Sequence, residues 1–286
     1  MLLGIDHAVI AVDDPDGTAA ALEADLGLIS SGGGRHEALG TFNRLVWLGD
    51  SYLELIGVFD RELAARSWLG PAVLEALARG GGLATWAIAV DDLEAQLRWA
   101  PEGSLVGPID GERRRDDGRV VRWRLAHPRA LLPSVPFLIE HDATGAEWTR
   151  AERDARAAEP HPLGGPVRLA SLHVETDSPA AAAARLRSIL STSAERAGRA
   201  AIRVPLGAQS AQFAAPATDE GEAAAAAAVE LIADAPIRRR AFRIGDCEIR
   251  VRRLPRPIAR PKTDATTGDA DATTSSADTD GAVRGD

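Results

Sequence analysis

The segment HAVIAVDDPDGTAAALEADLG, residues 7–27, first alternates apolar and small residues, then meets Asp-Asp-Pro and continues with an amphipathic pattern. The segment TWAIAVDDLEAQLRWA, residues 85–100, repeats this order, and both segments contain the string IAVDD. A third copy, SLHVETDSPAAAAARLRSILS, residues 171–191, keeps an acid and a proline at equivalent places. Each copy predicts a strand followed by a helix whose first turn is capped by Asp or Ser.

Further strand patterns follow each copy. In the first copy they cover residues 28–36, 41–48 and 51–58, and Gly49-Asp50 predicts a hairpin turn between the last two. In the second copy they lie around residue 106, over 120–127 and over 136–142. In the third copy they are AIRVPLG, AVELIA and DCEIRVRRL. The chain therefore predicts an α+β fold of three consecutive β-α-β-β-β modules.

Domain boundaries follow from these repeats. We expect module one at 1–62, a linker helix at 63–83, module two at 84–145, a linker at 146–165, a degenerate third module at 166–254 and a tail at 255–286. The stretch from Thr263 to Asp286 holds six Asp, one Arg and almost no large apolar residue. Such a composition cannot offset the entropy of ordering, so the acidic tail is predicted to be disordered.

Composition narrows the class of protein. The 286 residues carry a formal net charge of −9, which argues against a nucleic-acid partner. A single cysteine, Cys247, excludes a disulfide framework and a Cys-based zinc site. The N-terminus lacks a signal-peptide pattern, and no 18-residue apolar run predicts a membrane span. We expect a soluble cytoplasmic protein without a membrane partner.

The stretches GIDHAVIAV and YLELIGV resemble the vicinal oxygen chelate superfamily, and GGGRHEALGTFNRLVWLGDSYLELI resembles its glyoxalase-like branch. The resemblance implies that modules one and two pair into a cupped half-barrel of the glyoxalase/bleomycin-resistance type. It also implies one divalent metal ion, held by residues of the first and last strands of each module.

The resemblance places His7 and Glu54 at two ligand positions in module one. In module two, Thr85 stands at the position of His7 and is a poor ligand, whereas the pattern PFLIEHD places Glu140 at the position of Glu54. The implied ligand set is His7, Glu54 and Glu140, suited to Zn, Ni, Mn or Fe. A hydrogen-bonded structural His and an Arg-paired Glu remain the alternatives.

The third module predicts no metal site. Ser171 stands at the position of His7, and Arg250 at that of Glu54. An arginine is permanently charged and only donates hydrogen bonds, so this pair cannot hold a divalent cation. We expect the third module to cover a sheet edge, close the cup or form a homodimer contact.

Other residues are expected to border the cup. His36, beside the glycines 32–34, is a candidate general base, because its pKa lies near neutral pH, and a candidate replacement for the missing fourth metal ligand. Asn43, Tyr52 and Thr85 are candidates for substrate binding, and Arg124 for an anionic substrate group. The alternatives are a solvent-exposed loop His, a strand-edge hydrogen bond for Asn43 and a solvated Arg124.

Two functions fit this pattern. One is a metal-dependent lyase, isomerase or dioxygenase that acts on a small carbonyl or diol substrate, with His36 and Glu140 as catalytic residues. The other is a metal-free small-molecule binding or resistance protein of the same fold. Thr85 weakens the first reading, whereas His7 together with Glu54 supports it. A purely structural role for the modules is a third reading.

Overall fold

The computed structural model describes residues 2–115, 117–190, 192–197, 201–216, 225–234 and 240–253. The chain divides into two units, residues 1–254 and residues 255–286. The predicted acidic tail coincides with the second unit and lies outside the described residues.

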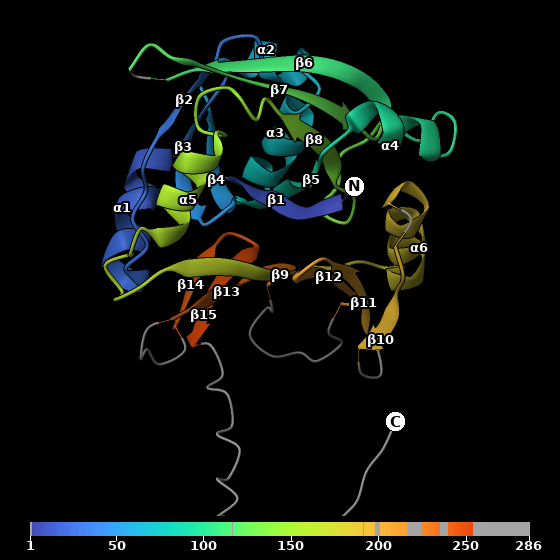
Figure 1. Cartoon of the computed structure of the whole chain (residues 1–286). Coiled ribbons are helices and arrows are strands. Elements are labelled where there is room, and N and C mark those ends of the chain that lie inside the picture. Colours follow the sequence, from blue (N-terminus) through green and yellow to red (C-terminus); the bar gives the residue numbers. More distant parts are fainter. Residues whose placement is uncertain are drawn as a thin grey trace, which may run out of the picture. The chain divides into compact units, whose positions relative to one another are not determined.

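The elements of the first half alternate as the repeats predict. They are β1 (Leu2–Ala11), α1 (Pro15–Leu26), β2 (Gly33–His36), β3 (Thr41–Leu48), β4 (Ser51–Val58), α2 (Arg61–Arg66), α3 (Gly70–Ala78), β5 (Gly82–Val90), α4 (Leu93–Trp99), β6 (Val106–Arg114), β7 (Val120–His127), β8 (Phe137–His141) and α5 (Arg150–Ala158). The strands form a closed barrel in the order β1-β4-β3-β2-β6-β7-β8-β5 (Figure 1). The fold is that of paired glyoxalase-type modules, closed into a barrel.

Local signals explain these elements. The side chain of Asp14 caps α1 by accepting a hydrogen bond from the Gly17 amide, and Pro15 opens the helix. The helix ends at Gly27, whose φ of +67° lies in the left-handed region that glycine adopts without steric cost. Gly49, with φ of +76°, turns β3 back into β4 as the Gly49-Asp50 pair predicts. None of the described helices has the length and apolar character needed to cross a membrane.

The second half forms a separate seven-stranded sheet, β10-β11-β12-β9-β13-β15-β14. Its elements are β9 (Val167–Glu175), α6 (Pro179–Leu190), β10 (Glu195–Ala197), β11 (Ala201–Leu206), β12 (Gln209–Ala214), β13 (Ala227–Ala233), β14 (Arg240–Ile244) and β15 (Cys247–Arg253). Strand β9 is parallel to β12 and antiparallel to β13, as β1 is to β4 and β5. Strand β13 is parallel to β15, as β5 is to β8. The predicted third module therefore spans the strands of two such units, the second of them shortened.

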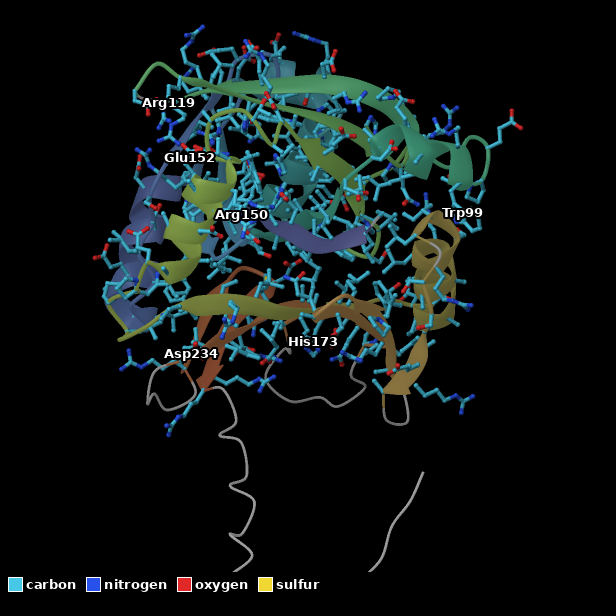
Figure 2. All side chains as sticks on the ribbon, in the orientation of Figure 1. Trp99, Arg119, Arg150, Glu152, His173 and Asp234 are labelled. Carbon is cyan, nitrogen blue, oxygen red and sulfur yellow. The ribbon has the colours of Figure 1, made fainter. Side chains whose placement is uncertain are left out.

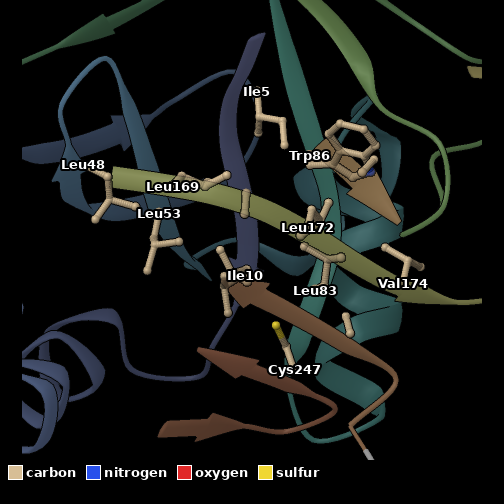
Figure 3. Close-up of a cluster of buried hydrophobic side chains, with 14 of the residues drawn as sticks. Ile5, Ile10, Leu48, Leu53, Leu83, Trp86, Leu169, Leu172, Val174 and Cys247 are labelled. Carbon is tan, nitrogen blue, oxygen red and sulfur yellow. The ribbon is translucent and has the colours of Figure 1, made fainter. Parts of the chain in front are cut away.

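An apolar core joins this sheet to the outer face of the barrel. Figure 3 shows Ile10, Leu53 and Trp86 of the barrel beside Leu172 and Val174 of β9. All of these side chains are at most 3 % exposed. Burial of apolar area at about 25 cal/mol per Å² makes such a continuous core the main stabilising term. The second sheet therefore packs on the barrel rather than completing its cup.

A polar contact also crosses this interface. The Oε1 atom of Gln209, on β12, accepts a hydrogen bond of 2.6 Å from the Ile5 amide of β1. Its Nε2 atom donates to the Ser51 hydroxyl at 2.9 Å. These bonds satisfy backbone and side-chain groups that are buried between the two sheets, where an unmade hydrogen bond is costly.

His161 predicts a pH dependence of stability. Its Nδ1 accepts from the Ile29 amide at 3.2 Å, and its Nε2 donates to the Trp47 carbonyl at 2.9 Å. Burial lowers the pKa of His161 although the bond to Trp47 opposes the shift, so below about pH 6.5 the unfolded chain binds a proton more readily than the folded chain. Stability therefore falls as the pH drops through this range.

The variant His161→Gln keeps one acceptor and one donor but cannot titrate. We expect it to reduce the loss of unfolding free energy between pH 6.5 and pH 5 by about 1 kcal/mol, the order of one proton over one pH unit. Urea unfolding at a series of pH values measures this change. An unaltered pH dependence in the variant would contradict the assignment.

Candidate active site

The barrel encloses a cavity of about 550 Å³, including the part that opens to solvent at its mouth. Inward-facing side chains of the strands and of the segment after β8 line it. The polar members are His7, His36, Asn43, Tyr52, Glu54, Arg113, His141 and Glu147. A cavity with apolar and aromatic walls and a few polar groups suits a small organic molecule. Five residues predicted from the sequence of module one thus lie around one cavity: His7, His36, Asn43, Tyr52 and Glu54.

Glu54 stands at the centre of the polar cluster. It is 6 % exposed on β4, and its Oε1 accepts a hydrogen bond of 2.6 Å from the Asn43 amide nitrogen on β3. The Nε2 atom of His7 lies 3.5 Å from Glu54 Oε2, and the Nε2 atom of His36 lies 4.0 Å from Oε1. A buried carboxylate needs such partners, because desolvation of an unpaired charge is costly.

Asp6 holds two imidazoles of the cavity. Its Oδ1 lies 2.5 Å from His7 Nδ1, and its Oδ2 lies 2.9 Å from His141 Nε2. Burial alone raises the pKa of Asp6, but the charge and hydrogen bonds of His141 and His7 outweigh it and hold that pKa well below its usual value. The carboxylate is therefore ionised, and it fixes His7 with Nδ1 toward Asp6 and Nε2 toward Glu54.

A β-bulge explains how Asp6 reaches this place. The pairing of β1 with β5 shifts between Ile5 and His7, so one extra residue is inserted in β1. A bulge changes the direction of the side chains around it, which regular alternation along the strand would not allow. Asp6 is 1 % exposed and contacts His7 beside it. Asp6 is not among the site residues predicted from the sequence, where its only sign is an acid next to His7 in an apolar strand.

His36 lies at the end of β2, 8 % exposed. Its Nδ1 is 3.0 Å from the Thr41 hydroxyl. Burial lowers the pKa of His36, the charge of Glu54 opposes this shift, and Arg113 and His7 add to it. At neutral pH His36 is therefore an uncharged imidazole. One of its ring nitrogens donates a hydrogen bond and the other accepts one, and the tautomer decides which. It lies in the cavity as the sequence predicts rather than on an exposed loop.

Aromatic side chains form much of the remaining wall. They are Trp47, Tyr52, Trp68, Trp123, Phe137 and Trp148. The Tyr52 ring stacks on His7 with centroids 4.4 Å apart, and Trp148 stacks on His141 at 3.5 Å. Burial raises the pKa of Tyr52 well above its usual value, and the charges of Asp6 and Glu54 add to the rise. Tyr52 therefore keeps its hydroxyl proton at neutral pH.

An ion pair fastens the segment after β8 to the barrel. Arg113 on β6 contacts Glu147 at 2.7 Å, with each side chain 5 % exposed, and donates to the Gly33 carbonyl at 2.6 Å. Arg115, more exposed, contacts the other oxygen of Glu147 at 2.5 Å. Glu147 has φ of +72°, a conformation that costs free energy for a residue with a side chain. These contacts hold Glu147 and Trp148 in the cavity wall.

The structure corrects the position predicted for Glu140. Val9 pairs with Glu54 across β1 and β4, and its counterpart in the repeat, Ala87, pairs with Phe137 across β5 and β8. Phe137 therefore occupies the position equivalent to Glu54. Glu140 lies three residues further on, and an odd offset places a side chain on the opposite face of a strand. His141, the next residue along β8, lies on the face opposite to Glu140 and lines the cavity.

Glu140 and Arg124 pair with each other outside the cavity. Arg124 Nη2 contacts both carboxylate oxygens of Glu140, at 3.0 and 2.9 Å, and Glu140 also accepts from the Leu93 amide. Neither residue is free for a substrate in the cavity. Thr85 is fully buried, and its hydroxyl is 3.4 Å from the Val135 carbonyl rather than in the cavity wall. These three predicted site residues are therefore not brought to His7 and Glu54.

The second sheet carries no equivalent cluster at the described positions. Register pairs Ser171 with Ser210 and His173 with Gln212, while Glu230 pairs with Arg250. Strands β9, β12, β13 and β15 correspond to β1, β4, β5 and β8. Ser171 therefore stands at the position of His7 and Gln212 at that of Glu54, while Ala228 stands at the position of Thr85 and Arg250 at that of Phe137. Arg250 also forms ion pairs with Glu230 and Glu248. The register thus corrects the predicted position of Arg250, because Gln212 stands at the position of Glu54 and Arg250 at that of Phe137.

The model of the glyoxalase-like domain family matches residues 5–190. The chain therefore belongs to this family, within the vicinal oxygen chelate superfamily. No match was found among curated proteins.

One solved structure shares the fold over most of the chain, and two others are similar to about half of it. A hypothetical protein from Staphylococcus aureus is similar with a TM-score of 0.69 and 16 % identity, over 87 % of this chain and 99 % of that chain. Methylmalonyl-CoA epimerase from Mycobacterium tuberculosis is 23 % identical, with a TM-score of 0.36, over 49 % of this chain and 87 % of that chain. A Streptomyces coelicolor methylmalonyl-CoA epimerase variant, in complex with 2-nitronate-propionyl-CoA, is 21 % identical, with a TM-score of 0.37. The match covers 50 % of this chain and 100 % of that chain.

The superfamily often uses a divalent metal, but the residues of this barrel do not fit the usual four-ligand site. Phe137 provides no donor atom, and its ring packs 5.4 Å from that of His7. Thr85 turns its hydroxyl to a backbone carbonyl. Over the described part of the chain, no group of three or more His, Cys, Asp or Glu side chains is placed to hold a metal ion. Only His7 and Glu54 remain of the ligand set.

Proposed function

We propose that this protein is an enzyme that binds a small organic molecule in the barrel and transfers a proton on it without a metal ion. The observation that carries the proposal is the Asp6–His7 pair, in which a buried carboxylate fixes an imidazole of the cavity wall. An acid that holds a His by Nδ1 leaves Nε2 as the nitrogen for proton transfer, and such orientation is a general device of acid–base catalysis.

The reaction that this arrangement supports is isomerisation or epimerisation next to a carbonyl group. His7 Nε2 takes a proton from the carbon beside the carbonyl, the electron pair of the broken C–H bond forms a C=C bond, and the π pair of the carbonyl moves to its oxygen. The protonated Tyr52 hydroxyl is a suitable donor for that oxygen, because a buried donor stabilises a developing negative charge strongly. Returning the proton to a different carbon or face completes an isomerisation, and His36, which lines the same cavity, is the second candidate for moving a proton.

A second function is binding or sequestration without chemistry. It is favoured by the aromatic lining, which could retain a ligand by packing alone. The metal-dependent lyase and dioxygenase reactions receive less support, because two of the four ligand positions hold Thr85 and Phe137.

Solvent deuterium exchange separates these functions. Small ketones and esters are incubated with the protein in D₂O, and NMR follows the loss of the proton next to the carbonyl. We expect exchange above the protein-free rate that persists after treatment with a chelator. His7→Gln should slow it by about a hundred- to ten-thousand-fold, the usual contribution of a general base.

The matched control is His173→Gln, a partly buried His on β9 of the second sheet (Figure 2), which should leave the rate unchanged. Binding without exchange would favour the sequestration function. Near-stoichiometric Zn, Ni, Mn or Fe in the purified protein, lost in Glu54→Ala, would overturn the metal-free mechanism.

A further inference from the structure

One charged side chain of the cavity wall, Glu54, has no Arg or Lys partner among the described residues; its contacts are with Asn43, His7 and His36. Arg113 is the only Arg or Lys among the described residues that line the cavity, and it already pairs with Glu147. Asp6, behind His7, is held by His7 and His141. The cavity therefore presents the negative charge of Glu54 to whatever enters it.

Asn43 adds an unused acceptor beside this charge. The side chain is 4 % exposed, and its Oδ1 atom is buried without a hydrogen-bond partner among the described residues. The orientation of the amide is fixed, because the carboxylate of Glu54 only accepts and must face the Nδ2 group. A buried acceptor without a partner costs about 1–3 kcal/mol, so a ligand that supplies an N–H group there gains affinity.

The aromatic walls also attract cations. Arg156, from α5, lies with its guanidinium carbon 4.0 Å from the Trp47 ring centroid and 5.4 Å from that of Trp148. Both tryptophans also line the cavity. The electron-rich faces of Trp and Tyr stabilise a positive charge, most strongly when the charge is removed from water.

We infer that the ligand of this cavity is a small molecule that carries a protonated amino group. The ammonium N–H groups bond to Glu54 and to Asn43 Oδ1, and the apolar body packs against the aromatic walls. A carboxylate ligand would face the charge of Glu54, and Arg113, the Arg of the described cavity wall, is already paired with Glu147. The inference rests on the proposed function in that it assigns the substrate class of the same cavity.

Four compounds of matched size test the inference: benzylamine, benzyltrimethylammonium, benzyl alcohol and benzoate. Isothermal titration calorimetry on the full chain should give benzylamine the highest affinity and benzoate the lowest. Benzyltrimethylammonium keeps the charge but has no N–H group, so it should bind more weakly than benzylamine. This comparison isolates the hydrogen bonds from the charge.

Two variants complete the test. Glu54→Gln should weaken benzylamine by about 10- to 100-fold, the range for hydrogen bonds to charged groups, and should leave benzyl alcohol within about twofold. Unchanged binding of benzyl alcohol also shows that the variant is folded. Glu140→Gln removes a carboxylate outside the cavity and should change neither affinity.

Equal or tighter binding of benzoate, no binding of benzylamine at millimolar concentration, or unchanged benzylamine affinity in Glu54→Gln would each overturn the inference. Different results would contradict the inferred substrate class and the proposed catalytic function. Exchange of uncharged ketones that depends on His7, without preference for amines, removes only the substrate class. Binding of benzylamine at Glu54 without any exchange removes only the catalytic proposal.

Discussion

Replacing Arg113 with leucine is expected to lower the free energy of unfolding by about 3 kcal/mol. The change leaves Glu147, 4 % exposed, without its buried partner and the Gly33 carbonyl without its donor. Removing one member of a buried ion pair costs about 3–5 kcal/mol, because the remaining charge stays desolvated. Arg115 still contacts Glu147, so the lower end of this range applies. Denaturant unfolding measures the change.

Arg115→Leu is the matched control, since it removes the other arginine from the same carboxylate. The Arg115 side chain is 27 % exposed, and we expect a loss of at most about 1 kcal/mol, as for solvent-accessible pairs. Adding Glu147→Gln to Arg113→Leu should recover part of the loss, because the unpaired charge is then absent. Equal losses in the two arginine variants would show that burial does not determine the strength of this contact.

Hydrophobic periodicity was sufficient to predict much of the fold. The strand-helix copies at residues 7–27, 85–100 and 171–191 correspond to β1–α1, β5–α4 and β9–α6. The resemblance to the glyoxalase-like branch placed His7 and Glu54 in the cup and favoured Asn43 over its neighbour Arg44, and the structure lines one cavity with these three residues. Such predictions succeed because a regular strand exposes alternate residues to the same side.

The remaining site residues depend on features that a single sequence does not encode locally. The bulge in β1 that brings in Asp6 depends on pairing with β5. The error at Glu140 has a similar cause, because the register of β8 is set by β5, and a shift by an odd number of residues exchanges the two faces. Glu147 and Trp148 reach the cavity from a segment between β8 and α5, where no periodicity predicts a position.

The fold also divides the third predicted module differently. The sequence aligns GDCEIRV, which leads into β15, with GDSYLEL, which leads into β4. In the structure β15 pairs with β13, and the strand that pairs with β9 as β4 pairs with β1 is β12. Long-range pairing of this kind cannot be chosen from strand patterns alone, because several partners satisfy the same alternation. The burial of single tryptophans could not be read from the strand and helix patterns either. Trp47 and Trp86 are buried, whereas Trp99 is 63 % exposed (Figure 2).

Asp6→Asn is expected to reduce the proposed proton transfer by about a thousand- to ten-thousand-fold, the scale found when a carboxylate that orients a catalytic His is replaced by an amide. Asn is nearly isosteric, but it presents one acceptor oxygen and one NH₂ group where Asp6 presents two acceptor oxygens to His7 and His141. One of the two imidazoles must then face a donor and change its tautomer. Asp6 acts through His7, so it is a positioning residue rather than a catalytic one.

The measurement that identifies this role is nitrogen NMR of the imidazoles together with exchange kinetics. We expect the ¹⁵N shifts of His7 or His141 to report a new tautomer, with kcat reduced and benzyl alcohol affinity unchanged. Asp16→Asn, an exposed acid paired with Arg44, should alter neither quantity. A merely structural Asp6 would lower stability without a change of tautomer and would reduce binding and turnover together. If the tautomers change while exchange continues at the original rate, His7 is not the base, and the proposed mechanism fails at its first step.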